Sequence, residues 1–131
     1  MKTKCLGIVA VLSFCLLVVT NWSDQFSGTW TWTGATNHAA ALVEPDPAGF
    51  SDWRLPTRAE WQAAVAAGTV GPLTANISPG NYFWTADTQG ANQAWAISIA
   101  TDANGNVIPG QSGTMKKFTK GSSLYAIAVR P

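Results

Sequence analysis

Few residues of this chain have side chains suited to catalysis or metal binding. The 131 residues include one histidine, His38, and two cysteines, Cys5 and Cys15, both near the N-terminus. A general base needs a nucleophile or a carboxylate beside it, and none stands at a recognisable spacing from His38. One histidine cannot form a three-histidine metal site. We therefore predict no catalytic residue, no metal site, no cofactor and no enzymatic activity.

A single segment has the oxygen-rich pattern of a calcium loop. Asp102, Asn104 and Asn106 stand at alternate positions, as calcium ligands do. A calcium loop of the EF-hand type would place a glutamate at its twelfth position, which is Gly113 here. Asn-Gly is also typical of a hairpin turn. We interpret this segment as a turn.

Two polar segments could bind a ligand. The first, 87–92, lies between two tryptophans, and the second, 110–117, ends in two lysines. Amides can hydrogen-bond to sugar hydroxyls, and an indole offers a large flat face for stacking. The alternative is that both segments are solvated loops with the tryptophans in the core. The candidate ligand-binding residues are Trp84, Asp87, Gln89, Asn92, Lys116 and Lys117.

The composition favours one folded domain with a polar, weakly charged surface. Apolar residues make up 47% of the chain and charged residues 11%, against about a quarter in an ordinary domain. A chain of this length suits one domain. After residue 20, Lys116, Lys117 and Lys120 form the only basic cluster, so we expect no nucleic-acid partner.

The N-terminus has the pattern of a secretory signal. A short basic segment, 1–4, precedes an apolar run, 6–19, which is shorter than the roughly 20 residues of a membrane span. We predict a signal peptide over 1–20 and one domain over 21–131. The exported chain would lack cysteine and a membrane span, and it would be secreted or held at the cell surface, with the periplasm as a further possibility.

Two helices are expected. The first covers about 33–43, capped by Thr31 or Thr33 and ended by the prolines that follow. The second begins at a capping box, in which Thr57 and Glu60 each bond to the other's backbone amide. Gly68 stands where a helix C-cap belongs.

Strand patterns occupy most of the remaining chain. We expect a first strand at 26–32 and later strands at 82–86, 94–100, around 115–118 and 124–129. In 94–100 the alternation predicts a half-buried strand with Trp95, Ile97 and Ile99 on one face. Helices separate from an antiparallel sheet make the fold class α+β.

One block of the sequence resembles a known family. Residues 49–61, Gly-Phe-Ser-Asp-Trp-Arg-Leu-Pro-Thr-Arg-Ala-Glu-Trp, are similar to the signature of the family named after the C-terminal domain of a collagen-like bacterial adhesin, the Lcl C-terminal domain. Shorter matches in the same order support the resemblance: Thr31-Trp32, Tyr82-Phe83-Trp84-Thr85, Ala94-Trp95 and Val129-Arg130.

The resemblance implies a fold and a class of function. The fold is C-type-lectin-like, with two helices packed on a small, mostly antiparallel sheet with long loops. The implied function is an exported, adhesion-like, non-catalytic module for a glycan or a surface protein, since the best-known member binds sulfated glycosaminoglycans. The near-neutral charge of this chain argues against a strong polyanion site. A structural or assembly role in a surface appendage is the alternative.

A second family shares part of the block. Residues 54–61 are similar to the helix-start motif of the formylglycine-generating and sulfatase-modifying enzymes, which use cysteine chemistry or a histidine-rich iron site. The predicted exported chain has no cysteine and only one histidine, His38, which cannot form such a site. This resemblance therefore implies a related fold, in a degenerate relative without catalysis.

Within the block, 52–56 is expected to mark the fold rather than a binding site. Trp53 and Leu55 should enter the core. Asp52 and Arg54 should fix the path of the chain through hydrogen bonds.

Overall fold

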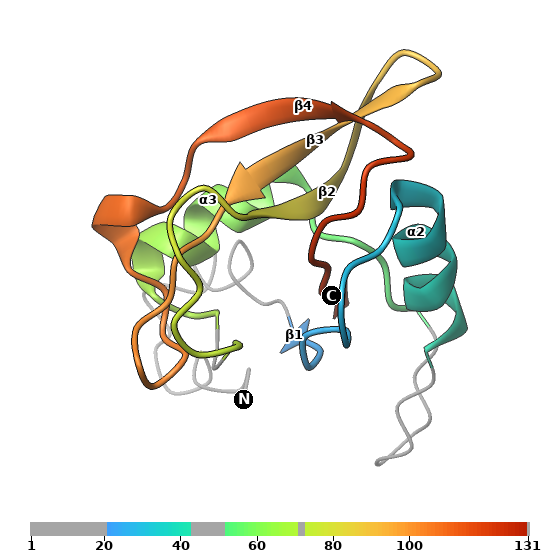
Figure 1. Ribbon diagram of the computed structural model, residues 1–131. Coiled ribbons are helices and arrows are strands. Elements are labelled where there is room, and N and C mark those ends of the chain that lie inside the picture. Colours follow the sequence, from blue (N-terminus) through green and yellow to red (C-terminus); the bar gives the residue numbers. More distant parts are fainter. Residues whose placement is uncertain (1–20, 43–51, 71–72, 131) are drawn as a thin grey trace, which may run out of the picture.

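The computed structural model describes residues 21–42, 52–70 and 73–130 (Figure 1). The predicted signal peptide and the first three residues of the 49–61 block lie outside these ranges. In chain order the elements are β1 (Asn21–Trp22), α2 (Trp32–Ala41), α3 (Arg58–Ala67), β2 (Tyr82–Gln89), β3 (Gln93–Ser98), the 3-10 turn η3 (Pro109–Gln111), β4 (Met115–Thr119) and β5 (Val129–Arg130). Two helices and antiparallel sheets confirm the α+β class.

Helix α3 begins and ends where the sequence predicts. The Thr57 hydroxyl accepts a hydrogen bond from the Glu60 amide, and the Glu60 carboxylate accepts one from the Thr57 amide. Gly68 ends the helix in the left-handed conformation, with φ 67°, which a residue without Cβ adopts at little cost. The helix buries Trp61, Ala64 and Val65 on one face.

The expected strand at 26–32 is wrong. Only Trp30 makes a bridge there, to Leu124. The Thr31 hydroxyl accepts a hydrogen bond from the Gly34 amide, and helix α2 already begins at Trp32. The local cap therefore prevails over the alternating pattern, and α2 packs against the core through Ala35 and Ala39.

Strands β2, β3 and β4 form an antiparallel sheet in that order. The β2 strand extends to Gln89, three residues beyond its predicted end, because the chain turns straight back into β3. The register shifts between Trp84 and Thr88, which marks a bulge. The β3 strand is buried on both faces rather than half-buried, with Ala94 and Ala96 as covered as Ile97.

The C-terminal segment, predicted as one strand over 124–129, is instead a series of bridges that joins separate parts of the chain. Leu124 pairs with Trp30, Tyr125 with Phe83, and Val129 with Arg54. Strand β5 pairs with β1, so that Asn21 lies opposite Arg130. A continuous strand is impossible here, because the partner changes every few residues.

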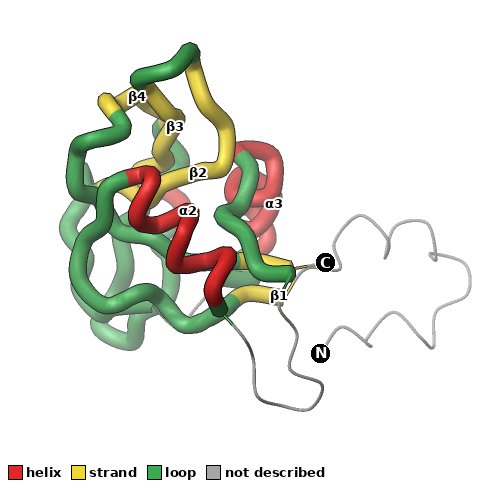
Figure 2. Tube along the Cα trace, turned by 90° about the vertical axis from the view of Figure 1, so that its right-hand side faces the viewer, coloured by secondary structure: helices red, strands yellow, loops and turns green. Residues whose placement is uncertain are grey.

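Two apolar clusters form the core, one with residues of α2 and the other with residues of α3. Figures 1 and 2 show where the two helices lie relative to the sheet. Trp84 joins the cluster beneath α2, whereas its neighbour Phe83 joins the cluster beneath α3. Trp53 and Leu55 are buried in the first cluster, as predicted. No helix in the described part of the chain is long and apolar enough to cross a membrane.

Candidate functional site

Trp84, the first of the predicted ligand-binding residues, is completely buried. Its side chain is 0% exposed, and its indole Nε1 donates to the Trp30 carbonyl oxygen at 2.7 Å. The ring also lies edge-on to Phe118. No face of this indole is open to a sugar, because the core already covers it.

Asp87 is held by helix α3. Its Oδ2 accepts from the Arg58 backbone amide at 2.8 Å and from Arg58 Nε at 3.1 Å. The bulge in β2 places Asp87 at the start of this helix, and the Thr85 hydroxyl supports the bulge by donating to the Trp95 carbonyl oxygen. A carboxylate beside a helix N-terminus is a stabilising arrangement, so Asp87 has a structural role.

Lys117 belongs to the same side of the sheet as Asp87. Its ammonium lies 5.6 Å from the centroid of the Trp95 ring, and the Arg58 guanidinium lies 4.5 Å from that centroid. Trp95 is half-buried and pairs in register with Lys117. Of the two tryptophans that flank segment 87–92, Trp84 is buried and Trp95 is partly exposed. The two cations lie over the ring of Trp95.

Gln89 and Asn92 lie at the β2–β3 hairpin. Both are exposed, and the Asn92 carbonyl oxygen accepts from the Lys120 amide at 2.8 Å. Gln89 and Asn92 therefore lie at the end of the hairpin, away from Asp87 and Lys117. The six predicted residues do not converge on one site.

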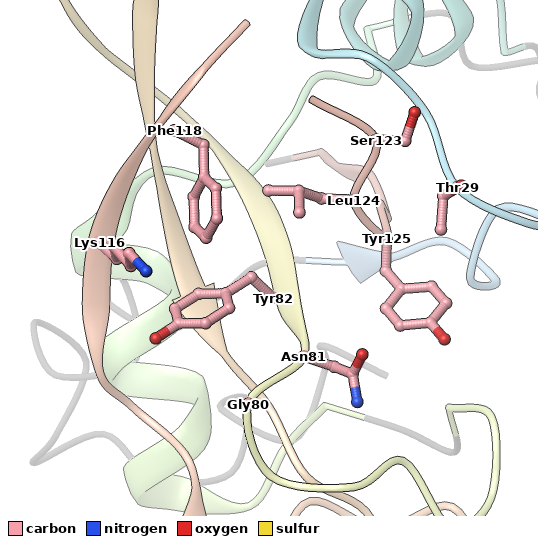
Figure 3. A pocket seen from close by; sticks show the side chains of 9 residues that line it. All are labelled: Thr29, Gly80, Asn81, Tyr82, Lys116, Phe118, Ser123, Leu124 and Tyr125. Atoms are coloured by element: carbon pink, nitrogen blue, oxygen red, sulfur yellow. The ribbon is translucent and has the colours of Figure 1, made fainter. Parts of the chain in front are cut away.

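Lys116 points to the opposite face of β4 from Lys117, and there it borders a pocket of about 230 Å³ (Figure 3). Its ammonium lies 5.2 Å from the centroid of the Phe118 ring. The pocket is formed by four separate chain segments and is lined by Thr29, Gly80, Asn81, Tyr82, Lys116, Phe118, Ser123, Leu124 and Tyr125.

Aromatic rings form much of the wall of this pocket. Tyr82 and Phe118 meet edge to face at 5.0 Å between centroids, and Tyr125 packs on buried Phe83 at 5.3 Å. Each tyrosine is half-buried, and its ring packs against another aromatic ring. The Asn81 side-chain amide donates to the Ser78 carbonyl oxygen and closes the turn at the rim.

The lining combines aromatic rings, hydroxyls, one amide and one ammonium group. The described lining residues include no carboxylate and no histidine, so Lys116 has the only formal charge among them. This set can stack on an apolar ring face and hydrogen-bond to hydroxyls or carbonyls.

Sequence reasoning missed Asn81, Tyr82 and Tyr125 as pocket residues. Tyr82, Lys116 and Phe118 share a sheet face through the register of three strands. Tyr125 reaches the same place only because Trp84 donates its amide to the Tyr125 carbonyl oxygen. Such pairing between distant segments gives no local sequence signal.

The segment at 102–106 is a turn, as interpreted. Asp102 Oδ1 accepts from the Asn104 amide at 2.8 Å and from the Asn106 amide at 2.9 Å. The carboxylate is therefore engaged in holding the loop. Within the described residues, no three His, Cys, Asp or Glu side chains are grouped as metal ligands.

His38 lies among aromatic side chains rather than beside a catalytic partner. Its ring stacks on Trp30 at 4.6 Å between centroids and meets Phe26 edge-on at 4.5 Å. The histidine thus extends the packing between α2 and the segment that precedes it.

Asp52 and Arg54 of the 49–61 block are both hydrogen-bonded, as predicted, and their partners are Arg130 and Glu60. Arg130 Nε lies 2.7 Å from Asp52 Oδ1, and its hydrogen bond holds the pKa of the Asp52 carboxyl below the usual value. Hydrogen bonds from Arg54 similarly lower the pKa of Glu60, and Glu60 in turn raises the pKa of Arg54. These pairs anchor the block to α3 and β5.

Comparison with known proteins gives one family. The family model described as the Lcl C-terminal domain matches residues 17–130. No curated protein matches the chain.

Proposed function

The chain belongs to the Lcl C-terminal domain family, and from this premise we propose that it is an exported, non-catalytic module that binds a glycan through the pocket beside Tyr82 and Tyr125. Membership of this family indicates a surface-related domain. The glycan ligand, the C-type-lectin-like fold and secretion or display at the cell surface are parts of the proposal.

The observation that carries the proposal is the lining of the pocket. Tyr82, Phe118 and Tyr125 offer ring surfaces, while Asn81 and Lys116 offer hydrogen-bond donors at the rim. Sugar rings present an apolar C–H face and a polar hydroxyl edge, and amphipathic tyrosines suit both. The volume of about 230 Å³ lies below the roughly 300–1,000 Å³ of sites for drug-sized ligands. The pocket therefore suits one ring of a larger glycan.

The same lining supports binding over hydrolysis. Glycoside hydrolysis ordinarily requires two carboxyl groups on either side of the scissile bond. Among the described residues nearby, Asp87 is bonded to Arg58 on the other side of the sheet, and the pocket itself is lined by no carboxylate. A glycan in this pocket would contact hydrogen-bond donors and aromatic rings, and it would lack the pair of carboxyl groups that hydrolysis requires.

A glycan array with the secreted protein tests the proposal. We expect binding to a restricted set of glycans, and Tyr125→Ala and Lys116→Ala should each weaken it by about tenfold, which corresponds to one or two lost contacts. Gln89→Ala is the matched control, because Gln89 is exposed at the hairpin. Calcium should make no difference to binding. Absence of binding to every glycan by a folded protein would refute the proposal.

A further inference from the structure

The outer edge of the three-stranded sheet is formed by β4. The order of strands is β2-β3-β4, and no strand in the described ranges pairs with the far side of β4. This strand runs along the outside of the molecule in both views (Figures 1 and 2). Three of its five side chains are exposed. An edge of this kind presents backbone groups that another chain can pair with.

The register shows which backbone groups point outward. The Lys120 amide donates to the Asn92 carbonyl oxygen, and the Ser98 amide donates to the Thr114 carbonyl oxygen, each at 2.8 Å. Hydrogen-bonded positions alternate along an antiparallel pair, so the even-numbered residues of β4 bond to β3. The N–H and C=O of Met115 and Lys117 therefore point away from the sheet, as does the N–H of Thr119.

The charge along this edge has one sign. Lys116 and Lys117 are exposed on opposite faces of β4, and Lys120 follows the strand. Each ammonium lies over an aromatic ring, whereas the three ion pairs of the described residues all use arginine. None of these lysines therefore forms an ion pair with a carboxylate of the described residues.

These lysines disfavour pairing of β4 with a second copy of itself and favour pairing with an acidic strand. In a pair of identical β4 strands centred on residue 117, Lys117 would face Lys117, and like charges directly opposite are destabilising. Acidic side chains at the same positions would be attracted instead. We propose that the outer edge of β4 is a docking site for an extended acidic segment of a partner protein, which adds to the sheet as a fourth strand.

This site is distinct from the glycan pocket, although the side chain of Lys116 borders both. The pocket uses side chains on one face of the sheet, whereas strand addition uses the backbone of Met115 and Lys117. The two proposals can therefore fail separately. Tyr125→Ala should weaken glycan binding and leave peptide binding unchanged.

The test uses a capped peptide of alternating Glu and Thr, about seven residues long, enough to cover five-residue β4. The amides of Met115 and Lys117 should shift in the NMR spectrum of the protein and become protected from hydrogen exchange. A Lys-Thr peptide of the same length should not bind. A peptide N-methylated at alternate residues, in the frame that faces β4, should also fail to bind, because it lacks the donors for the ladder.

Two variants at one position separate the backbone from the charge. Lys117→Pro removes an outward N–H, which an edge strand tolerates, and should weaken peptide binding by about tenfold or more. Lys117→Thr keeps the N–H and removes the charge, so the loss should be only about threefold. Thermal unfolding of both variants shows whether the fold is kept, and the N-methylated peptide decides the matter if Lys117→Pro does not fold.

Three results would overturn the proposal. The first is equal binding of the N-methylated and unmethylated peptides, which would mean that the lysines act only as a charged patch, as they would toward a sulfated glycan. The second is an equal loss in the two Lys117 variants when both fold. The third is a dimer in sedimentation that Lys117→Pro dissociates, because the edge would then serve a second copy of the chain.

Discussion

Arg54 and Glu60 face each other in a two-point ion pair, in which Nη1–Oε1 and Nη2–Oε2 are both 2.7 Å apart. The same carboxylate accepts the Thr57 amide through Oε1. Glu60 thus closes the capping box of α3 and fixes the extended segment before the helix. The Glu60 carboxylate therefore links Arg54 to the start of α3 within the 49–61 block.

Glu60→Gln should lower the free energy of unfolding by about 1–2 kcal/mol, because it removes the charge from both the ion pair and the cap. Arg54→Lys should cost less, since one bond to the carboxylate can survive. Urea unfolding at neutral pH measures both. Gln62→Ala, on the exposed side of α3, is the control, and a change for Glu60→Gln no larger than that of the control would contradict the assignment.

Stability should fall as the pH drops below about 4.5. The hydrogen bonds from Arg54 lower the folded-state pKa of Glu60, and the bond from Arg130 lowers that of Asp52. A depressed carboxyl pKa stabilises the fold above the unfolded-state pKa, and this contribution is lost as the pH falls through the folded-state value. Melting temperatures from about pH 7 to about pH 3 measure the effect. Glu60→Gln should flatten the curve, and an unchanged slope would count against the ion pair.

Gly105→Ala should destabilise the protein by more than about 2 kcal/mol. Gly105 has φ +81°, and a Cβ there would overlap the Leu73 carbonyl oxygen. Gly90 is the matched control, because it has φ +71° with no atom near the position of its Cβ. Gly90→Ala should therefore cost only about 1 kcal/mol, from backbone strain alone. Thermal unfolding of the two variants tests the difference, and equal losses would mean that the contact with Leu73 is unimportant.

Trp84→Phe should lower stability by about 2–3 kcal/mol, because it leaves a cavity and removes the indole hydrogen bond to the Trp30 carbonyl oxygen, which keeps only the bond from the Leu124 amide. Trp95→Phe should cost less, about 1 kcal/mol, since Trp95 is half-buried and its ring contacts are with flexible cations. Chemical unfolding followed by circular dichroism compares them. If Trp84→Phe reduced glycan binding without loss of stability, its role would be in recognition instead.

Calcium should leave the thermal stability unchanged. Asp102 Oδ1 already accepts two backbone amides of its own loop, so the loop is ordered without an ion. Asp102→Ala should lower stability by about 1–2 kcal/mol through the loss of both bonds. A calcium-dependent rise in melting temperature, lost in Asp102→Ala, would contradict this view.

Local features of the sequence determine the starts and ends of the helices. The capping box at Thr57 and Glu60 needs residues only three positions apart, and Gly68 needs only its own backbone freedom. The Thr31 cap works the same way, although the alternating pattern around it predicted a strand. Burial of Trp53 and Leu55 was also predictable. Large apolar side chains are usually buried, and the charged residues that alternate with them are usually exposed.

The tertiary structure decided which side chains meet. Trp84 and Trp95 look alike in the sequence, yet the pairing of β2 with the C-terminal segment buries one, and the position of β3 leaves the other half-covered by cations. The pocket brings together Asn81, Lys116 and Tyr125 from three segments. The sequence by itself determined the family block, the helix caps and the α+β class, since these depend on neighbouring residues. The candidate site depends on contacts between distant residues, whose partners only the folded chain brings together.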